Sequence, residues 1–369
     1  MLGFVRVLKP ALLCVVSGAW IFLSLRNKLW AHKKRNQLKA IKVISRGQNL
    51  RPVDADEISI GSFNVLADQW ACPKRMSYVL PQYLTWEHRK PLIVEEIESA
   101  DADIWCLQEV DIGRWDELLE GLEGYTGVLQ QKKGMEGAGA VCALLYKAAR
   151  LQLLWTESRS RTMLAAFKFV DTYGLDQVLY CINCHLEGSP YRPNDRVSQI
   201  RSSLHRLQQF QQQVPGVTVE DQLLVVCGDF NSGKSESVWR LLYRGRLEGG
   251  ATEPHLPNVE VTKSTISHPY VLLDAYNSAG VELPFTRKVP QLGSTLDHIF
   301  TSSEFSVSSV YWPLTLRGTD SDQLQRLHLP NQFHPSDHLP IGCVIRLRQP
   351  SLAAQSMYQQ QDAVLNHEN

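Results

Sequence analysis

Six apolar runs of this 369-residue chain end in, or lead directly into, side chains that bind metals or transfer protons. Taken singly, each has a structural explanation, such as an asparagine in a turn or an aspartate that caps a helix. Because six such positions follow one another along the chain, we expect them to form one site for metal binding and acid-base catalysis. They are Asn64, Gln108 with Glu109, Asn183 with His185, Asp229 with Asn231, Asp297, and Ser336 with Asp337 and His338.

The apolar patterning predicts the strands and helices that position these residues. Strands are predicted at 58–65, 103–108, 140–146, 163–170, 177–184, 223–230, 295–301 and 341–347. Helices are predicted at 86–99, 114–122, 195–213 and 235–243, the last opened by a serine that suits an N-cap. Several neighbouring strands have no helix between them, which argues against a doubly wound parallel sheet. A single domain with two mixed sheets covered by helices fits better.

Five motifs within residues 57–347 carry a family resemblance. They are FNVLAD, WEHRK, LQEV, GDFNS followed by the SESVWRLLYRG segment, and PSDHLP. With them the chain resembles the endonuclease/exonuclease/phosphatase superfamily, and within it the branch of CCR4-type deadenylases, nocturnin and angel-like proteins. The resemblance implies an α+β fold, a four-layer sandwich of two mixed β-sheets flanked by helices, with the active site at one edge of the sheets. It also implies a metal-dependent phosphoester hydrolase, a nuclease or phosphatase.

The resemblance assigns three residues to the metal. Phosphodiester cleavage requires positive charge near the non-bridging oxygens, and Mg²⁺ prefers oxygen ligands such as the carboxylate of Glu109 and the amide of Asn64. Asp337 is expected to add to this ligand set. The predicted cofactor is Mg²⁺, with Mn²⁺ as a substitute.

Five residues are predicted to be catalytic. Asp229 and Asn231 are two apart, so in an extended segment both point the same way; Asp229 would take a proton from water or hold a second metal, and Asn231 would orient the phosphate. His185 would donate to a phosphate oxygen. The family pairs His338 with an aspartate, here Asp297, which would fix the histidine tautomer and favour the imidazolium form.

The chain departs from the deadenylase pattern around the substrate. After His185 it reads LEGSPYRPNDR, from which Pro190, Arg192 and Arg196 are predicted to bind substrate together with Asn183. A plain strand-to-helix connection is the alternative for this loop. His298 stands where many relatives have an aromatic residue, and we expect it to pack. The aromatic that stacks on adenine in deadenylases is absent from the local run PQLGST, which leaves adenine preference open.

Eight cysteines lie mostly in apolar runs and are predicted to be buried, reduced thiols. Cys181 and Cys184 form a C-x-x-C in a predicted strand, where their odd spacing sends the two thiols to opposite faces. With no second pair at zinc spacing, we do not expect a zinc site there.

Residues 1–53 carry eleven basic and no acidic side chains and include an uncharged run at 10–25. This run predicts a membrane anchor, and the basic excess after it predicts a cytosolic catalytic domain. Import into a mitochondrion or another organelle is the main alternative, and a signal peptide or a peripheral helix is also open. The catalytic domain is predicted at 54–348, followed by a polar tail at 349–369.

The composition excludes a disordered or repeat protein, and residues 54–369 carry 27 basic and 38 acidic side chains, a charge unsuited to general nucleic-acid binding. The function predicted is that of a Mg²⁺-dependent phosphodiesterase resembling CCR4-type 3′-exoribonucleases and nocturnin, with RNA or a nucleotide as substrate and no obligate protein partner. The alternative is a membrane-associated phosphatase or phosphodiesterase acting on a dinucleotide, an oligoadenylate or a phospholipid. A non-enzymatic module is disfavoured because no reactive position is missing.

Overall fold

The computed structural model describes residues 41–52, 54, 56–131, 139–170, 177–212, 223–314 and 326–347. The predicted anchor at 10–25 and the predicted tail at 349–369 lie outside these residues.

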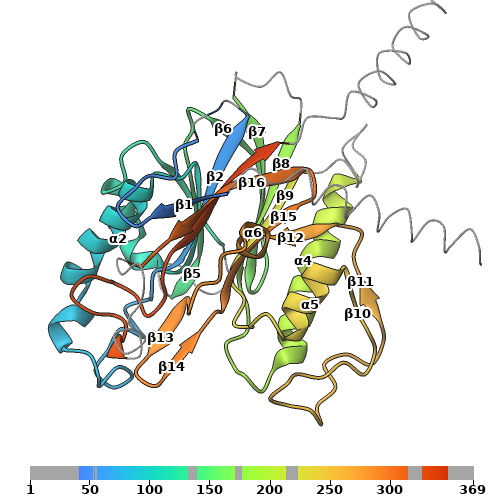
Figure 1. The fold of residues 1–369 in the computed structure, drawn as a ribbon. Coiled ribbons are helices and arrows are strands. Elements are labelled where there is room, and N and C mark those ends of the chain that lie inside the picture. The colour runs from blue at the N-terminus through green and yellow to red at the C-terminus, as the bar shows by residue number, and fades with distance from the viewer. Residues whose placement is uncertain are drawn as a thin grey trace, which may run out of the picture. The chain divides into compact units, whose positions relative to one another are not determined.

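Two mixed β-sheets form the centre of the described chain (Figure 1). The seven-stranded sheet consists, in spatial order, of β1 (Lys42–Ser45), β16 (Phe305–Trp312), β17 (Ile341–Leu347), β2 (Glu57–Asn64), β3 (Ile104–Asp111), β5 (Ala140–Tyr146) and β4 (Thr126–Leu129). The six-stranded sheet consists of β12 (Leu272–Asp274), β15 (Asp297–Ser302), β9 (Leu223–Asp229), β8 (Val178–His185), β7 (Thr162–Phe169) and β6 (Leu151–Ser158). Two short ribbons pair β10 (Arg246–Leu247) with β11 (Ile266–Ser267), and β13 (Arg287–Val289) with β14 (Leu292–Ser294).

Helices cover the outer face of each sheet. Helices α2 (Trp86–Ala100) and α3 (Trp115–Glu120) pack on the seven-stranded sheet, where Ile93 and Leu118 share a cluster with Trp105 of β3. Helices α4 (Pro193–Gln211) and α5 (Ser237–Arg244) pack on the six-stranded sheet. The remaining helices are short: η1 (Pro81–Leu84), η2 (Ile112–Arg114) and α6 (Ala275–Ala279).

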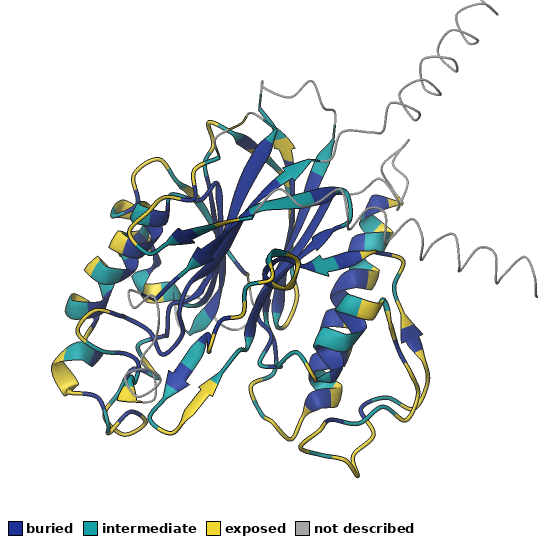
Figure 2. Cartoon of the chain, viewed as in Figure 1, coloured by how far each residue is buried: buried dark blue, intermediate teal, exposed yellow. Residues whose placement is uncertain are grey.

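The main core lies between the two sheets, whose central strands are mostly buried (Figure 2). It contains alternate residues of β3 and β8, such as Cys106 and Cys181, whereas Cys184 lies in the outer cluster under α4 and α5. The predicted opposite orientation of the two C-x-x-C thiols is therefore confirmed. The sequence did not indicate that Cys106, Cys181 and Cys227 approach one another across the core, with sulfur atoms within 4.8 Å.

Strand pairing brings the polar strand ends to one edge. β2 runs parallel to β3 with Asn64 opposite Gln108, and β8 runs parallel to β9 with His185 opposite Asp229. β15 is antiparallel to β9, so its first residue, Asp297, lies opposite Asp229. Carboxyl ends of parallel strands share an edge, and the two sheets thus present their polar ends side by side.

The predicted α+β four-layer sandwich is confirmed, and all eight predicted strands are present within a few residues of their predicted ends. The edge strands β1, β4, β6 and β12, the long strand β16 and the two short ribbons were not predicted. Edge strands are half-exposed, so their apolar pattern is weak. Helix α5 has no serine cap: Ser237 opens it, and its main-chain N–H donates to the buried Glu253 carboxylate at 2.9 Å.

The strand β1 indicates where the catalytic domain begins. Residues 42–45, which fall in the segment predicted to precede the catalytic domain, pair with Ser309 to Trp312 of β16. We therefore propose that the domain begins near residue 42.

The predicted membrane location is corrected. Among the described residues, no helix is both long and apolar enough to cross a bilayer. The run at 10–25, on which the prediction was based, lies outside the described residues, and the membrane-anchored assignment is not retained.

Candidate active site

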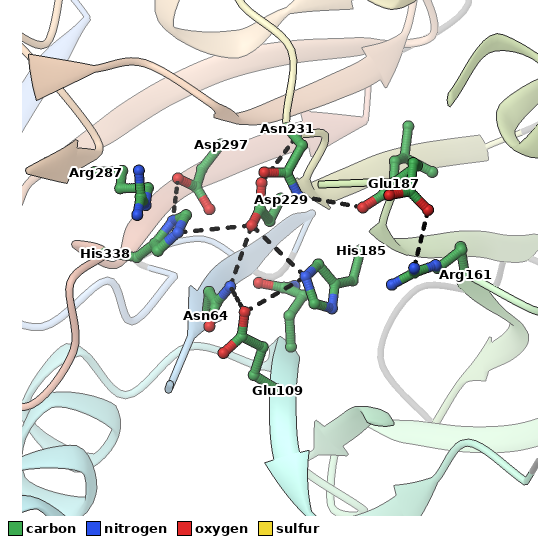
Figure 3. Close-up of polar contacts among 12 residues, drawn as sticks. Asn64, Glu109, Arg161, His185, Glu187, Asp229, Asn231, Arg287, Asp297 and His338 are labelled. Atoms are coloured by element: carbon green, nitrogen blue, oxygen red, sulfur yellow. Dashed lines mark hydrogen bonds and ion pairs between the residues drawn. The ribbon is translucent and has the colours of Figure 1, made fainter. Parts of the chain in front are cut away.

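A cavity of about 750 Å³ opens at the edge where the polar strand ends meet. Six of the predicted site residues line it, and they come from both sheets and from the loop before β17. They are Glu109, His185, Asp229, Asn231, Asp337 and His338. Figure 3 shows how most of these six side chains converge, and it places Asn64 and Asp297 next to them.

Glu109 reaches the cavity through a break in strand β3. The β3–β5 register shifts between Leu107 and Val110, and Glu109 has a left-handed φ of 58°. A bulge of this kind re-aims a side chain that regular alternation would direct elsewhere. The Glu109 carboxylate accepts a hydrogen bond from the main-chain N–H of Ala67 at 3.2 Å.

The amide of Asn64 joins the two sheets at the site. Its Nδ2 donates to Glu109 Oε1 at 3.0 Å and to Asp229 Oδ2 at 3.1 Å. Its carbonyl oxygen, the atom that would bind a metal, accepts from the main-chain N–H of Leu66 at 3.1 Å. The role of Asn64 as a ligand stays a prediction, whereas its position between two carboxylates is established.

His185 and Asp229 complete a group of possible ligands. His185 Nε2 lies 3.4 Å from Glu109 Oε1 and 3.9 Å from Asp229 Oδ2. One ligand atom from each of Glu109, His185 and Asp229 falls within 4.8 Å of the others. The pairing of strand β8 with strand β9, which brings His185 next to Asp229, depends on Gly228. Its φ is +133°, and a Cβ at this position would lie 2.1 Å from the main-chain oxygen of Cys184.

Burial dominates the electrostatics of the two acids. It raises the pKa of Glu109 to about 7, with a further contribution from the Asp337 carboxylate. It also raises the pKa of Asp229 to about 6, although the positive charge of His338 opposes this shift. Desolvated carboxylates so close together are costly unless a cation neutralises them, so this donor set fits a divalent cation.

A second group centres on His338. Its Nδ1 donates to Asp297 Oδ2 at 2.9 Å, and its Nε2 lies 3.6 Å from Asp229 Oδ2. Burial opposes the charged imidazolium, but the carboxylates of Asp297 and Asp229 outweigh it and raise the pKa of His338 to about 10. The hydroxyl of Thr286 donates to the same oxygen of Asp297 at 2.5 Å and so holds this acid in place.

Asp337 lies beside the cavity in an ion pair. Its Oδ2 accepts from Arg287 Nε at 2.9 Å, and its main-chain oxygen accepts from the N–H of Lys288. The hydroxyl of Ser336 donates to the main-chain oxygen of Asn64 at 2.6 Å and ties this loop to β2. The ligand role of Asp337 stays a prediction, since the side chain is engaged by Arg287.

Asn231 borders the other side of Asp229. It has a left-handed φ of 48°, and its main-chain N–H donates to Asp229 Oδ1 at 2.8 Å. Its amide Nδ2 donates to the main-chain oxygen of Leu186 at 3.1 Å. Asn231 therefore fixes both the carboxylate of Asp229 and the loop that follows β8.

The four residues predicted to bind substrate do not line the cavity, and for the two buried ones, Asn183 and Arg196, the prediction is corrected. Asn183 is fully buried between the sheets, where its amide donates to the main-chain oxygens of Leu107 and Ala143. Arg196 is 1% exposed and donates to the main-chain oxygen of Ser189 at 2.6 Å. Both residues hold the framework of the site, because each bonds to main chain beside it.

The other two, Pro190 and Arg192, are exposed on the loop before α4. The main-chain oxygen of Pro190 lies 3.0 Å from His255 Nε2, and Arg192 pairs with Asp195 of α4. The substrate role of Pro190 and Arg192 stays a prediction, with a plain strand-to-helix connection as its alternative. His298 packs as expected: its ring stacks on Phe230, and its Nε2 lies 2.9 Å from the main-chain oxygen of Ser232.

Sequence reasoning missed the cations and aromatics of the cavity wall, namely Arg75, Arg161, Arg287, Trp70 and Tyr78. Only the position of Arg161 could have been predicted from the sequence, because it lies just before a predicted strand. That strand, β7, is antiparallel to β8, so Arg161 lies beside the end of β8 that carries His185. Arg287 opens the short strand β13, and Arg75, Trp70 and Tyr78 belong to the loop between β2 and η1, whose course follows no local pattern. Leu292, in the run where relatives carry a stacking aromatic, is 56% exposed, and Phe285 is buried in a separate cluster.

The model of the endonuclease/exonuclease/phosphatase family matches residues 61–338, and the chain belongs to this family. At the level of the family, the predicted class of phosphoester hydrolase is confirmed.

Relatives and solved structures agree with the predicted branch. The Ccr4 3′-5′-exoribonuclease subunit of the CCR4-Not complex from Neosartorya fischeri is 26% identical over 359 residues, covering 78% of this chain and 46% of the relative. The Candida albicans subunit is 24% identical over 337 residues, covering 81% and 42%. The chain thus spans less than half the length of these two curated relatives.

Two solved structures share the fold. That of ANGEL2, described as a 2′,3′-cyclic phosphatase in complex with adenosine-2′,3′-vanadate, has a TM-score of 0.65 at 23% identity, covering 79% of this chain and 96% of that one. The human nocturnin catalytic domain with bound sulfate has a TM-score of 0.55 at 22% identity, covering 79% and 95%. The predicted resemblance to the CCR4, nocturnin and angel branch is confirmed.

Proposed function

We propose that this protein is a divalent-metal-dependent phosphodiesterase that uses Mg²⁺, with Mn²⁺ as a substitute. One observation carries the proposal. Glu109 and His185 bring possible ligand atoms from two different sheets to Asp229, and Asp229 also contacts the buried pair of His338 and Asp297. A structural role alone does not account for this concentration of buried charge beside an open cavity.

Glu109 and Asp229 are the carboxylates that would hold the cation, and His185, whose Nε2 lies 3.4 Å from Glu109 Oε1, would donate to a phosphate oxygen. When bound, Mg²⁺ supplies positive charge that offsets the negative charge of the phosphate oxygens. Carboxylate oxygens are the ligands that Mg²⁺ prefers. We keep Asn64 and Asp337 as predicted contributors whose present contacts are with Leu66 and Arg287.

The remaining groups divide the acid-base work. An ionised Asp229 is placed to accept a proton from the attacking water, since its Oδ2 faces the cavity between His185 and His338. His338, kept protonated by Asp297, is placed to donate to a phosphate oxygen. Asn231 holds Asp229 through its main-chain N–H and would orient the phosphate with its side chain.

The proposed substrates are the 3′ end of RNA or a small nucleotide phosphate. The curated relatives with exoribonuclease activity support the first, and the cavity with three arginines in its wall is consistent with either. The two differ in charge, so cleavage of RNA should weaken steeply as salt is added, whereas cleavage of a dinucleotide should depend on salt less.

The test is hydrolysis of poly(A), mixed RNA, 2′,5′-oligoadenylate and NADPH with Mg²⁺, Mn²⁺, Ca²⁺ or EDTA. We expect turnover of at least one substrate with Mg²⁺ and none with EDTA. Glu109→Gln should lower turnover by orders of magnitude and weaken Mg²⁺ binding while its unfolding midpoint stays near that of the wild type. Activity that persists in EDTA, or near-normal turnover of Glu109→Gln at saturating Mg²⁺, would contradict the proposal.

A further inference from the structure

Arg161 is a cation in the cavity wall to which the proposed reaction gives no role. Its side chain is 35% exposed and lines the same cavity as Glu109 and Asp229. Its main-chain oxygen accepts from the N–H of His185 at 2.9 Å, which fixes its position next to the catalytic group.

The guanidinium of Arg161 is held by a rigid partner. Its Nη2 donates to Glu187 Oε2 at 3.0 Å. Glu187 is 14% exposed at its side chain, its main-chain N–H donates to Gln199, and its main-chain oxygen accepts from the buried Arg196. An arginine oriented in this way loses little conformational entropy when it binds an anion.

The position of Arg161 separates it from Arg287. Arg287 is paired with Asp337 and forms a β-bridge with His338, so it belongs to the central group. Arg161 lies beyond His185, on the far side of the central group from Arg287, as Figure 3 shows. One phosphate at the central carboxylates would be near Arg287 and His338, which leaves Arg161 for a different anionic group.

We propose that Arg161 binds a second phosphate of the substrate, one that is not hydrolysed. This inference rests on the proposed function and narrows its substrate class to phosphate esters that carry two phosphates on one sugar or on adjacent nucleotides. Arginine suits this task because its planar guanidinium can donate two hydrogen bonds to one phosphate.

The test measures binding without turnover, by calorimetry in Ca²⁺. The ligands are adenosine 3′,5′-bisphosphate and the two monophosphates, 3′-AMP and 5′-AMP. Wild-type protein should bind the bisphosphate more tightly than either monophosphate. Arg161→Gln should weaken binding of the bisphosphate by about tenfold, while the affinity for at least one monophosphate changes less than about twofold. Arg161→Lys should be intermediate, since it keeps the charge but not the paired donors.

Arg159→Gln is the matched control. Arg159 lies in the same hairpin, its side chain is 42% exposed and pairs with Glu157, and it does not line the cavity. The control removes the same charge and should leave all three affinities unchanged. An equal effect of the two variants, or an equal loss of bisphosphate and both monophosphates in Arg161→Gln, would overturn the inference.

Hydrolysis assays in Mg²⁺ distinguish a failure of the proposed function from a failure of the role assigned to Arg161. A wild-type protein that prefers the bisphosphate through Arg161 but hydrolyses no phosphoester would contradict the proposed function. A protein that hydrolyses RNA with the same KM in wild type and Arg161→Gln would contradict the assignment of Arg161 alone. Unfolding midpoints of both variants, compared with wild type, establish that the fold is intact.

Discussion

The side chain of Asn64, on the seven-stranded sheet, donates a hydrogen bond of 3.1 Å to the carboxylate of Asp229, on the six-stranded sheet. The same nitrogen donates to Glu109 at 3.0 Å. One neutral amide therefore lies between the half-buried Glu109 and the buried Asp229, and it links the layers of the sandwich at the edge that carries the site.

Replacing Asn64 should disturb both the site and the fold. Asn64→Ala removes one hydrogen-bond donor from each of the carboxylates of Glu109 and Asp229, and we expect a loss of about 2–3 kcal/mol in the free energy of unfolding. Turnover should fall by about 100-fold, because the carboxylates lose their fixed spacing. Urea unfolding and steady-state kinetics measure the two effects. Asn64→Asp, an acceptor of the same shape, should be no better than alanine, and wild-type activity in that variant would contradict the donor role.

Asp297 is expected to act by positioning His338. Asp297→Asn keeps the shape of the side chain but no longer favours the charged imidazole, so kcat should drop by about 100-fold or more. The affinity for the metal should change little, because Asp297 lies behind His338 and does not line the cavity. Kinetics and metal titration of the variant test this division. A variant with normal kcat would show that the pair of Asp297 and His338 does not serve the reaction.

Arg89 holds the loop after β2 against the loop that carries Asp337. Its buried guanidinium donates to the main-chain oxygens of Leu66 at 2.7 Å and Pro335 at 3.3 Å, and it pairs with Asp68. Arg89→Met leaves these acceptors unsatisfied, and we expect a loss of about 3–5 kcal/mol in stability. Chemical unfolding measures it. Arg89→Lys keeps the charge and should lose less, so equal losses would indicate that packing rather than hydrogen bonding dominates.

His334 should make the protein sensitive to acid. Burial, and the nearby Arg46, lower the pKa of His334 to about 3. In the unfolded chain histidine binds a proton below about pH 6.5, so between that pH and about 3 only the unfolded state gains it. The contribution of His334 is therefore fully present above pH 6.5, and stability falls by about 1.4 kcal/mol per pH unit below it.

The test compares unfolding free energies of wild type and His334→Gln between pH 7.5 and 4.5. The variant should lose stability less steeply as the pH falls. His205→Gln, which removes an exposed histidine of α4, is the matched control. Parallel pH curves for wild type and His334→Gln would contradict the prediction.

The positions of eight strands along the chain and the reactive residues near their ends could be predicted from the sequence, whereas the order of the strands within the sheets could not. Alternating apolar runs mark each strand, and parallel strands place their ends at a common edge, so Glu109, Asp229 and His338 follow from local pattern and a recognisable set of motifs. The sequence predicts that Glu109 and His185 lie in one site. The distance of 3.4 Å between Glu109 Oε1 and His185 Nε2 comes from the structure.

The roles of the surrounding residues were decided by tertiary contacts. Asn183 and Arg196 resemble substrate ligands in the sequence, yet both are buried and bond to the main chain, because a polar side chain between packed layers must find a partner there. Arg161 enters the cavity only because β7 pairs with β8 in one register. Strand ends are set by residues close together in the chain, whereas the cavity wall is set by loops that meet only when the two sheets pack.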